Sequence, residues 1–180
     1  MQTVALTDKQ LVLDLRAGDK KAFALLYERY RASVLAYCSR ILNDAEDAED
    51  VVQDVFIKAR DGIASLTDGM LCKHWLFRIA RNEALMKIRR RHPTQQIEDD
   101  TAWETDTPMD HLERLEATAI VRQLLKDLKF EYREVLVLRE YGGLSYSAIA
   151  EIVGVSTDVV RVRIYRARSS MTEKLKRFYG

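Results

Sequence analysis

The sequence predicts an all-α protein of two small helical domains, joined by an acidic flexible linker, with a helix-turn-helix in the C-terminal domain. Only two prolines and seven glycines interrupt 180 residues, so long helices are allowed. Apolar residues recur every three or four positions, and strand-like alternation is hard to find. One acidic stretch separates the halves. The expected parts are residues 1–92, 93–110 and 111–180.

The N-terminal domain is expected to contain three or four helices. The helical pattern from Asp8 to Arg91 is interrupted near Gly18, near Asn43 and over 61–73. One long apolar stripe predicts the core that these helices share. Its members are Phe23, Leu26, Tyr27, Tyr30, Val34, Tyr37 and Ile41.

The segment 44–58 begins with carboxylates and becomes apolar after one or two turns. Asp44 can cap a helix there, and acids in the first turn complement the positive end of the helix dipole. Asp50 and Asp54 lie too far along the segment for that explanation. A helix with acids outward and apolar residues inward suits a basic protein partner, so the segment predicts a protein-binding face with no internal partner for its acids.

The segment 75–92 is strongly basic, with six Lys or Arg residues opposed by Glu83 alone. Basic side chains neutralise phosphates, aromatic rings can stack on unpaired bases, and the amide of Asn82 can contact a base edge. Trp75 is more simply explained as a core residue than as a base contact. The segment predicts contact with nucleic acid.

Residues 93–110 hold six carboxylates, both prolines and no Lys or Arg, which predicts an extended linker that is disordered in isolation. Helical periodicity resumes at Leu112, and a second helix is expected near 131–141. Gly142 and Gly143 then turn the chain.

The segment 144–168 predicts two short helices at a sharp angle, as in a DNA-binding helix-turn-helix. Ser145 can cap the first helix and Gly154 can end it through a positive φ; Ser156 or Thr157 can cap the second. The second helix is basic outside its apolar seam, as entry into a major groove requires. That seam comprises Val160, Ile164, Ala167, Met171 and Leu175.

Four motifs in order resemble the extracytoplasmic-function group of sigma factors in the sigma-70 family, and the match covers nearly the whole chain. They are Gly18-Asp-Lys-Lys-Ala-Phe23, Asp50-Val-Val-Gln-Asp-Val-Phe-Ile-Lys58, Trp75-Leu-Phe-Arg-Ile-Ala-Arg-Asn82, and Arg133-Glu-Val-Leu136 leading into Gly143-Leu-Ser-Tyr-Ser-Ala-Ile-Ala150.

The resemblance implies three sets of contacts. The acidic helix would bind the clamp helices of the RNA polymerase β′ subunit through Asp47, Asp50, Val51, Gln53, Asp54 and Ile57. The minus-10 promoter element would be read as single strand, with a flipped base near Asn82, by Lys58, Leu66, Arg78, Arg81, Asn82, Lys87, Arg89, Arg90 and Arg91. The minus-35 element would be read in the major groove by Thr157, Arg161, Val162, Arg163, Tyr165, Arg166 and Arg168.

The resemblance also implies the β flap of core polymerase and an anti-sigma factor as partners, and a linker that follows the RNA path. It gives no promoter sequence, because the second helix reads Asp158-Val-Val-Arg-Val-Arg163 where Gly-Thr-Val-Arg-Ser-Arg is common in the family. Leu66 also stands where an aromatic is frequent. We expect sigma-factor activity, no catalysis and no cofactor.

Charge and cysteine content bear on which partners and which cellular location the protein has. Net charge is only +1, yet the charges are segregated into blocks of opposite sign. Cys38 and Cys72 lack metal-ligand spacing, and no signal or membrane-span pattern is present, which favours reduced thiols and a cytoplasmic location.

An autonomous helix-turn-helix regulator of duplex DNA remains an alternative. A nuclease that binds metal at Asp47, Asp50 and Asp54 would lack the second cluster of a two-metal site.

Overall fold

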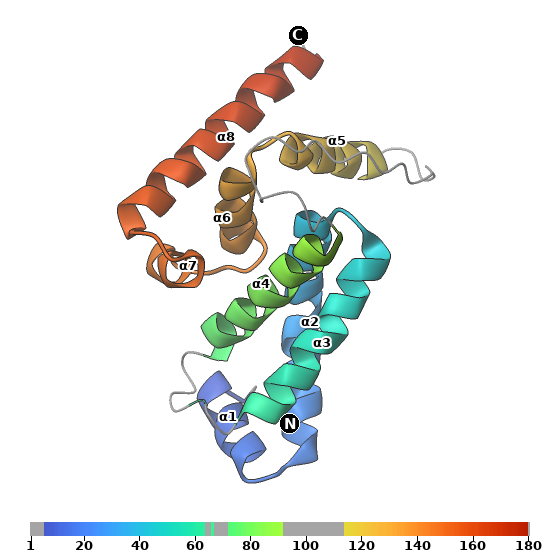
Figure 1. Ribbon diagram of the computed structural model, residues 1–180, viewed down its shortest axis with the longest axis vertical. Helices are drawn as coiled ribbons and strands as arrows, with labels where there is room; N and C mark the ends of the chain where they lie inside the picture. The colour runs from blue at the N-terminus through green and yellow to red at the C-terminus, as the bar shows by residue number, and fades with distance from the viewer. Residues whose placement is uncertain (1–5, 64–65, 67–71, 92–113, 180) are drawn as a thin grey trace, which may run out of the picture.

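The computed structural model describes residues 6–63, 66, 72–91 and 114–179, and all regular structure in these ranges is helical (Figure 1). The helices are α1 (Asp8–Arg16), α2 (Lys20–Leu42), α3 (Ala45–Gly62), α4 (Cys72–Arg91), α5 (Arg114–Lys126), α6 (Phe130–Glu140), α7 (Tyr146–Val153) and α8 (Thr157–Tyr179). The all-α prediction is confirmed. The predicted linker at 93–110 lies outside the described residues.

Helices α1 to α4 form the N-terminal half, in which α2 packs against the other three. The breaks between helices are set by local chemistry. Asn43 ends α2 in the left-handed region at φ 54°, and the Asp44 side chain caps α3 by accepting the Asp47 amide at 2.9 Å. Of the predicted core stripe, Phe23 and Tyr27 are partly buried and the remaining members fully buried.

Helices α7 and α8 form the helix-turn-helix, and α6 packs against both. Ser145 Oγ accepts the Ala148 amide at 3.1 Å, and Gly154 ends α7 at φ 77°, both as the sequence predicts. Ser156 caps α8 by accepting the Val159 amide at 3.3 Å. The choice between Ser156 and Thr157 is thereby resolved.

The apolar seam of α8 is only partly buried. Val160, Ile164 and Ala167 are buried against the rest of the C-terminal half, and Met171 is partly buried. Leu175 is exposed. The packed part of α8 therefore ends near Met171, and the helix extends beyond it (Figure 1).

The two halves pack directly on each other. Helix α4 contacts α7, and α2 contacts α5 and α6, so that buried side chains form one continuous core. The turn after α6 is pressed onto α4: a Cβ on Gly142 would lie 2.5 Å from the Leu138 carbonyl oxygen and 3.2 Å from Phe77 Cε1. Only glycine fits at Gly142, and Gly143 follows it with a left-handed φ of 58°.

The two cysteines are free and fully buried. Burial raises the pKa of both thiols to about 12, so almost no reactive thiolate is present near neutral pH. None of the described helices is both long and apolar enough to span a membrane.

Candidate nucleic-acid interface

Helix α4 distributes its basic residues over three sides, which the sequence pattern alone did not separate. Arg78, Asn82 and Arg89 lie within about 40° of one another around the helix, because each residue advances about 100°. All three are exposed, and so is Arg90. None of the four side chains makes a hydrogen bond or ion pair with the described part of the chain. Arg78, Asn82 and Arg89 form the open face of α4, and Arg90 lies about 120° around the helix from Arg78.

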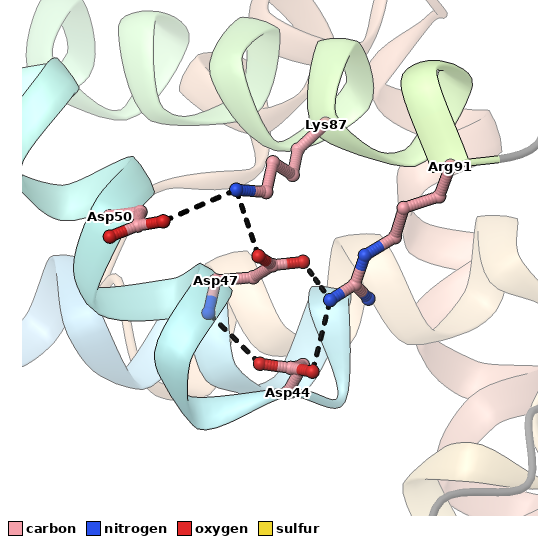
Figure 2. A network of polar contacts seen from close by, with 5 residues as sticks. All are labelled: Asp44, Asp47, Asp50, Lys87 and Arg91. Carbon is pink, nitrogen blue, oxygen red and sulfur yellow. Dashed lines mark hydrogen bonds and ion pairs between the residues drawn. The ribbon is translucent and has the colours of Figure 1, made fainter.

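A second side of α4 faces the acidic start of α3 (Figure 2). Lys87 Nζ lies 2.8 Å from Asp47 Oδ1 and 3.3 Å from Asp50 Oδ2. Arg91 contacts Asp47 as well and lies 3.0 Å from Asp44 Oδ2. Two cations that the sequence assigned to DNA contact are therefore bound to carboxylates of the same chain.

The acidic face of α3 is consequently not as the sequence predicted. Asp47 has internal partners, and its side chain is only 14% exposed. Val51 is 2% exposed and belongs to the core. The exposed stripe on α3 that can still meet another protein consists of Asp50, Gln53, Asp54 and Ile57, of which Asp50 also contacts Lys87 but remains 58% exposed.

A third side of α4 meets α6. The Arg81 guanidinium donates to both carboxylate oxygens of Glu134, at 2.8 and 3.3 Å. Glu134 is almost fully buried, and its burial raises the pKa of the carboxyl, while Arg81 opposes that shift. Burial lowers the pKa of the neighbouring Arg133, and Glu134 opposes that change. Arg81 thus links the two halves and does not lie on the open face.

Two further residues predicted for minus-10 contact lie elsewhere. Lys58 Nζ lies 2.6 Å from Glu83 Oε1, so this lysine joins α3 to α4. Leu66 is 6% exposed and packs in the core, where a promoter base does not reach it in this conformation. Burial of the leucine side chain is favoured by the hydrophobic effect, so exposing Leu66 to contact DNA would cost free energy.

Helix α8 presents a mixed face to solvent near its N-terminus. Val162 is exposed and Tyr165 is 73% exposed, which is high for apolar and aromatic side chains. Arg161 is exposed beside them and pairs with Asp158 one turn earlier, at 2.6 Å. Thr157 is half-buried at the start of the helix. These side chains can contact base edges and methyl groups in a major groove.

The next three arginines of α8 contact α6. Arg163 is half-buried and pairs with Glu131, so it faces the helix-turn-helix core and not the groove. Arg166 donates to the Tyr132 hydroxyl at 3.1 Å, and Arg168 lies 2.6 Å from Glu140. Arg166 and Arg168 are nonetheless exposed, and pairs of this kind contribute little, so phosphates can compete for them.

Glu134 is the residue of greatest structural weight that sequence reasoning missed. Its signal was present, because the four residues after Arg133 and Glu134, from Val135 to Leu138, are all apolar and buried. A charge in such a run needs a partner. The single acid Glu83 in a basic helix carried a similar signal.

Among the described residues, no group of three His, Cys, Asp or Glu could hold a metal ion, and Asp47 is already neutralised by Lys87 and Arg91.

A helix-turn-helix whose second helix exposes arginine, valine and tyrosine side chains defines a DNA-binding protein. Comparison with protein families matches residues 26–94 to sigma-70 region 2 and residues 118–171 to sigma-70 region 4. The chain belongs to the sigma-70 family, in its extracytoplasmic-function (ECF) group of RNA polymerase sigma factors.

The relatives cover nearly the whole chain. The RNA polymerase sigma-H factor of Pseudomonas aeruginosa is 36% identical, over 94% of this chain and 94% of its own. The ECF RNA polymerase sigma-E factor of Haemophilus influenzae is 37% identical, over 95% and 96%. The solved structure of CnrH in complex with the cytosolic domain of CnrY is 28% identical, covers 94% of this chain and 97% of that chain, and superposes with a TM-score of 0.72. The sigma factor RpoE of Bartonella quintana, solved with the anti-sigma factor NepR, is 27% identical, covers 87% and 98%, and has a TM-score of 0.68.

Proposed function

We propose that this chain binds core RNA polymerase through α3 and directs it to promoters through α4 and α8. The observation that carries the proposal is the coexistence of three exposed faces of matching chemistry: an acidic stripe on α3, a basic face with one amide on α4, and a mixed face on α8. The chain acts as an initiation factor and not as an enzyme, and it works where polymerase is, in the cytoplasm. A run-off transcription assay with core polymerase and genomic promoter fragments tests this function; an autonomous regulator would bind operator DNA tightly without polymerase and start no transcripts.

The α3 stripe is the proposed contact for the β′ clamp helices. Asp50, Gln53, Asp54 and Ile57 recur at three- and four-residue spacing on the exposed side of α3, and Ile57 adds an exposed apolar side chain. Charged side chains around an apolar centre are typical of protein interfaces. Asp47 and Val51 are largely buried and are not part of the proposed contact.

Reversing the charge of Asp50 and Asp54 to Lys is expected to weaken binding to core polymerase by at least about tenfold, because opposite charges across an interface become like charges. Both side chains are exposed, and the ion pair that Asp50 makes with Lys87 is the one internal contact that the printed ion pairs show the variant losing, so the fold should remain intact. The control is reversal of Glu28 and Glu173, two exposed acids on α2 and α8, which changes net charge equally. Equal affinities of both variants in a competition assay with core polymerase would rule out the α3 stripe as the contact.

The exposed start of α8 is the proposed reader of the minus-35 element. Arg161, Val162 and Tyr165 lie in the first turns, where side chains reach base edges, whereas Lys176 and Arg177 are several turns further on. Arg163 supports the helix through Glu131 and is not a reader.

Arg161→Ala is expected to reduce affinity by roughly 1–3 kcal/mol at one base pair and to relax preference there. Lys176→Ala should weaken binding to all sequences alike or leave it unchanged, since a distal lysine reaches phosphates at most. A promoter library scored with both variants measures this. A position-specific loss for Lys176 and a uniform loss for Arg161 would mean that the helix enters the groove in the opposite direction.

The packed arrangement of the two halves is proposed to be a closed state. The minus-10 and minus-35 elements lie about 25 base pairs apart, which is roughly 85 Å of duplex at 3.4 Å per base pair. Helix α4 contacts α7, and α7 packs on α8, so the two reading helices are separated by about two helix spacings, roughly 20 Å. Both elements therefore cannot be read until α4 and α7 separate.

The linker at 93–110 is the proposed tether that permits this separation and follows the RNA path of polymerase. The helix-turn-helix half is also the proposed site for the β flap. Because the solved relatives CnrH and RpoE are complexes with CnrY and with the anti-sigma factor NepR, we include an anti-sigma factor among the partners of this chain.

A further inference from the structure

The start of α3 and the end of α4 form one ion cluster, here called the α3–α4 cluster, of Asp44, Asp47, Asp50, Lys87 and Arg91 (Figure 2). Asp47 is its centre, since its carboxylate contacts both cations. Asp44 has a second task as the cap of α3. The cluster therefore fixes the last turn of α4 to the first turn of α3.

Helical geometry separates the cluster from the open face of α4. Lys87 stands nine residues after Arg78, which places it about 180° around the helix, and Arg91 stands thirteen residues after, at about 220°. Arg89 stands eleven residues after and returns to about 20°. The cations of α4 thus point in opposite directions: Arg78 and Arg89 to solvent, Lys87 and Arg91 to α3.

Burial strengthens the hold of the cluster on its cations. The Asp47 side chain is 14% exposed and that of Lys87 is 28% exposed, so water screens their attraction less than that of an open surface pair. Asp44 and Asp47 also lie at the positive end of α3 and Arg91 at the negative end of α4, where both helix dipoles favour them. A DNA phosphate would have to displace partners that are already well placed.

We propose that Asp47 is a positioning residue that occupies Lys87 and Arg91 as a phosphate would, so that single-stranded DNA is bound only by the opposite face, with Arg78, Asn82 and Arg89. This inference rests on the proposed function of α4 and refines it, because it removes two of the predicted DNA contacts. It also assigns Asp47 to the chain itself and not to polymerase.

The salt dependence of DNA binding tests the proposal. The probe is a fluorescent single-stranded oligonucleotide of mixed sequence, titrated with the full chain at several salt concentrations. Each phosphate neutralised contributes about 0.7 to the slope of log affinity against log salt for a single strand. Arg89→Gln is expected to lower that slope by about 0.7, whereas Lys87→Gln should leave it unchanged.

Asp47→Asn is expected to raise the slope of log affinity against log salt. Substitution of a residue that only stabilises the fold would not raise it. Loss of the Asp47 charge should raise the slope, by less than the value of about 1.4 that two fully released cations would add, because Asp50 and Asp44 still lie 3.3 Å from Lys87 and 3.0 Å from Arg91. In the double variant Asp47→Asn, Lys87→Gln the increase should be about half as large. Equal losses of slope for Lys87→Gln and Arg89→Gln, or no increase for Asp47→Asn, would overturn the proposal.

If the wild-type chain binds no oligonucleotide, thermal unfolding tests the ion pairs of the α3–α4 cluster instead. That result would count against the proposed function of α4 and not against the pairing. Lys87→Gln and Asp47→Asn are then expected to lower the melting temperature by a few degrees each, with a combined loss smaller than the sum, while Arg89→Gln has no effect. Additive losses would show that Asp47 does not hold Lys87.

Discussion

Glu134→Ala is expected to lower the free energy of unfolding by about 3–5 kcal/mol, the usual result of removing one partner of a buried ion pair. Glu134 is buried between Arg81 of α4 and Arg133 of its own helix, so the truncation leaves two cations without their nearest anion. For a chain of this size, the melting temperature should fall by at least about 6 °C. Calorimetry or circular dichroism measures the change.

The matched control is Glu140→Ala on the same helix. Glu140 pairs with Arg168, but both side chains are about half exposed, so its removal should change stability by less than about 1 kcal/mol. Glu134→Gln should recover only part of the loss, because the amide oxygen keeps the shape and can accept from Arg81 but carries no negative charge. Similar effects for Glu134→Ala and Glu140→Ala would show that the contact between α4 and α6 is not formed in solution.

A covalent link between α4 and α7 is expected to abolish promoter-specific transcription and to be fully reversible. His74 Nδ1 lies 3.6 Å from Glu151 Oε2, so cysteines at these two positions are within reach of a short bifunctional methanethiosulfonate. The natural cysteines are buried with thiol pKa values of about 12 and should not react. Run-off transcription is measured before linking, after linking and after reduction.

The linked chain should lose essentially all activity, since reading helices roughly 20 Å apart cannot reach elements roughly 85 Å apart. Each single-cysteine variant, treated with the same reagent, reports the effect of modification without a link. Mass spectrometry confirms that the link is intramolecular. Transcription by the linked chain within twofold of the reduced chain would mean that the closed state is compatible with initiation.

Local features of the fold were predictable because short-range chemistry sets them. The cap at Ser145, the helix end at Gly154 and the buried position of Val160 follow from residues a few positions away. The family resemblance, carried by motifs in a fixed order, also gave the correct family. The comparisons confirm both the fold class and the family.

Side-chain partners were less predictable because they depend on how helices meet. Basic residues in 75–92 look alike in sequence, yet Arg89 faces solvent, Lys87 faces α3 and Arg81 faces α6. The relative directions follow from helical spacing, but the identity of the neighbour on each side requires the tertiary structure. Leu66 illustrates the same limit, since a loop gives no periodicity from which burial could be inferred.

Because the two halves contact each other, the DNA affinity of the protein depends on the fraction of molecules in which they are separated. Only open molecules can bind both promoter elements, so the apparent dissociation constant equals the intrinsic constant divided by the open fraction. A closed state favoured by about 2.7 kcal/mol leaves roughly one molecule in a hundred open and weakens apparent affinity about a hundredfold. In the proposed closed state that fraction depends on the apolar core that the halves share and on three polar contacts: the Arg81–Glu134 pair, the Lys73 hydrogen bond to the Gly143 carbonyl oxygen at 3.2 Å, and Arg40 stacked 3.6 Å over the Tyr141 ring. A binding partner that prefers the open form can therefore switch promoter affinity on without touching a single residue that reads DNA.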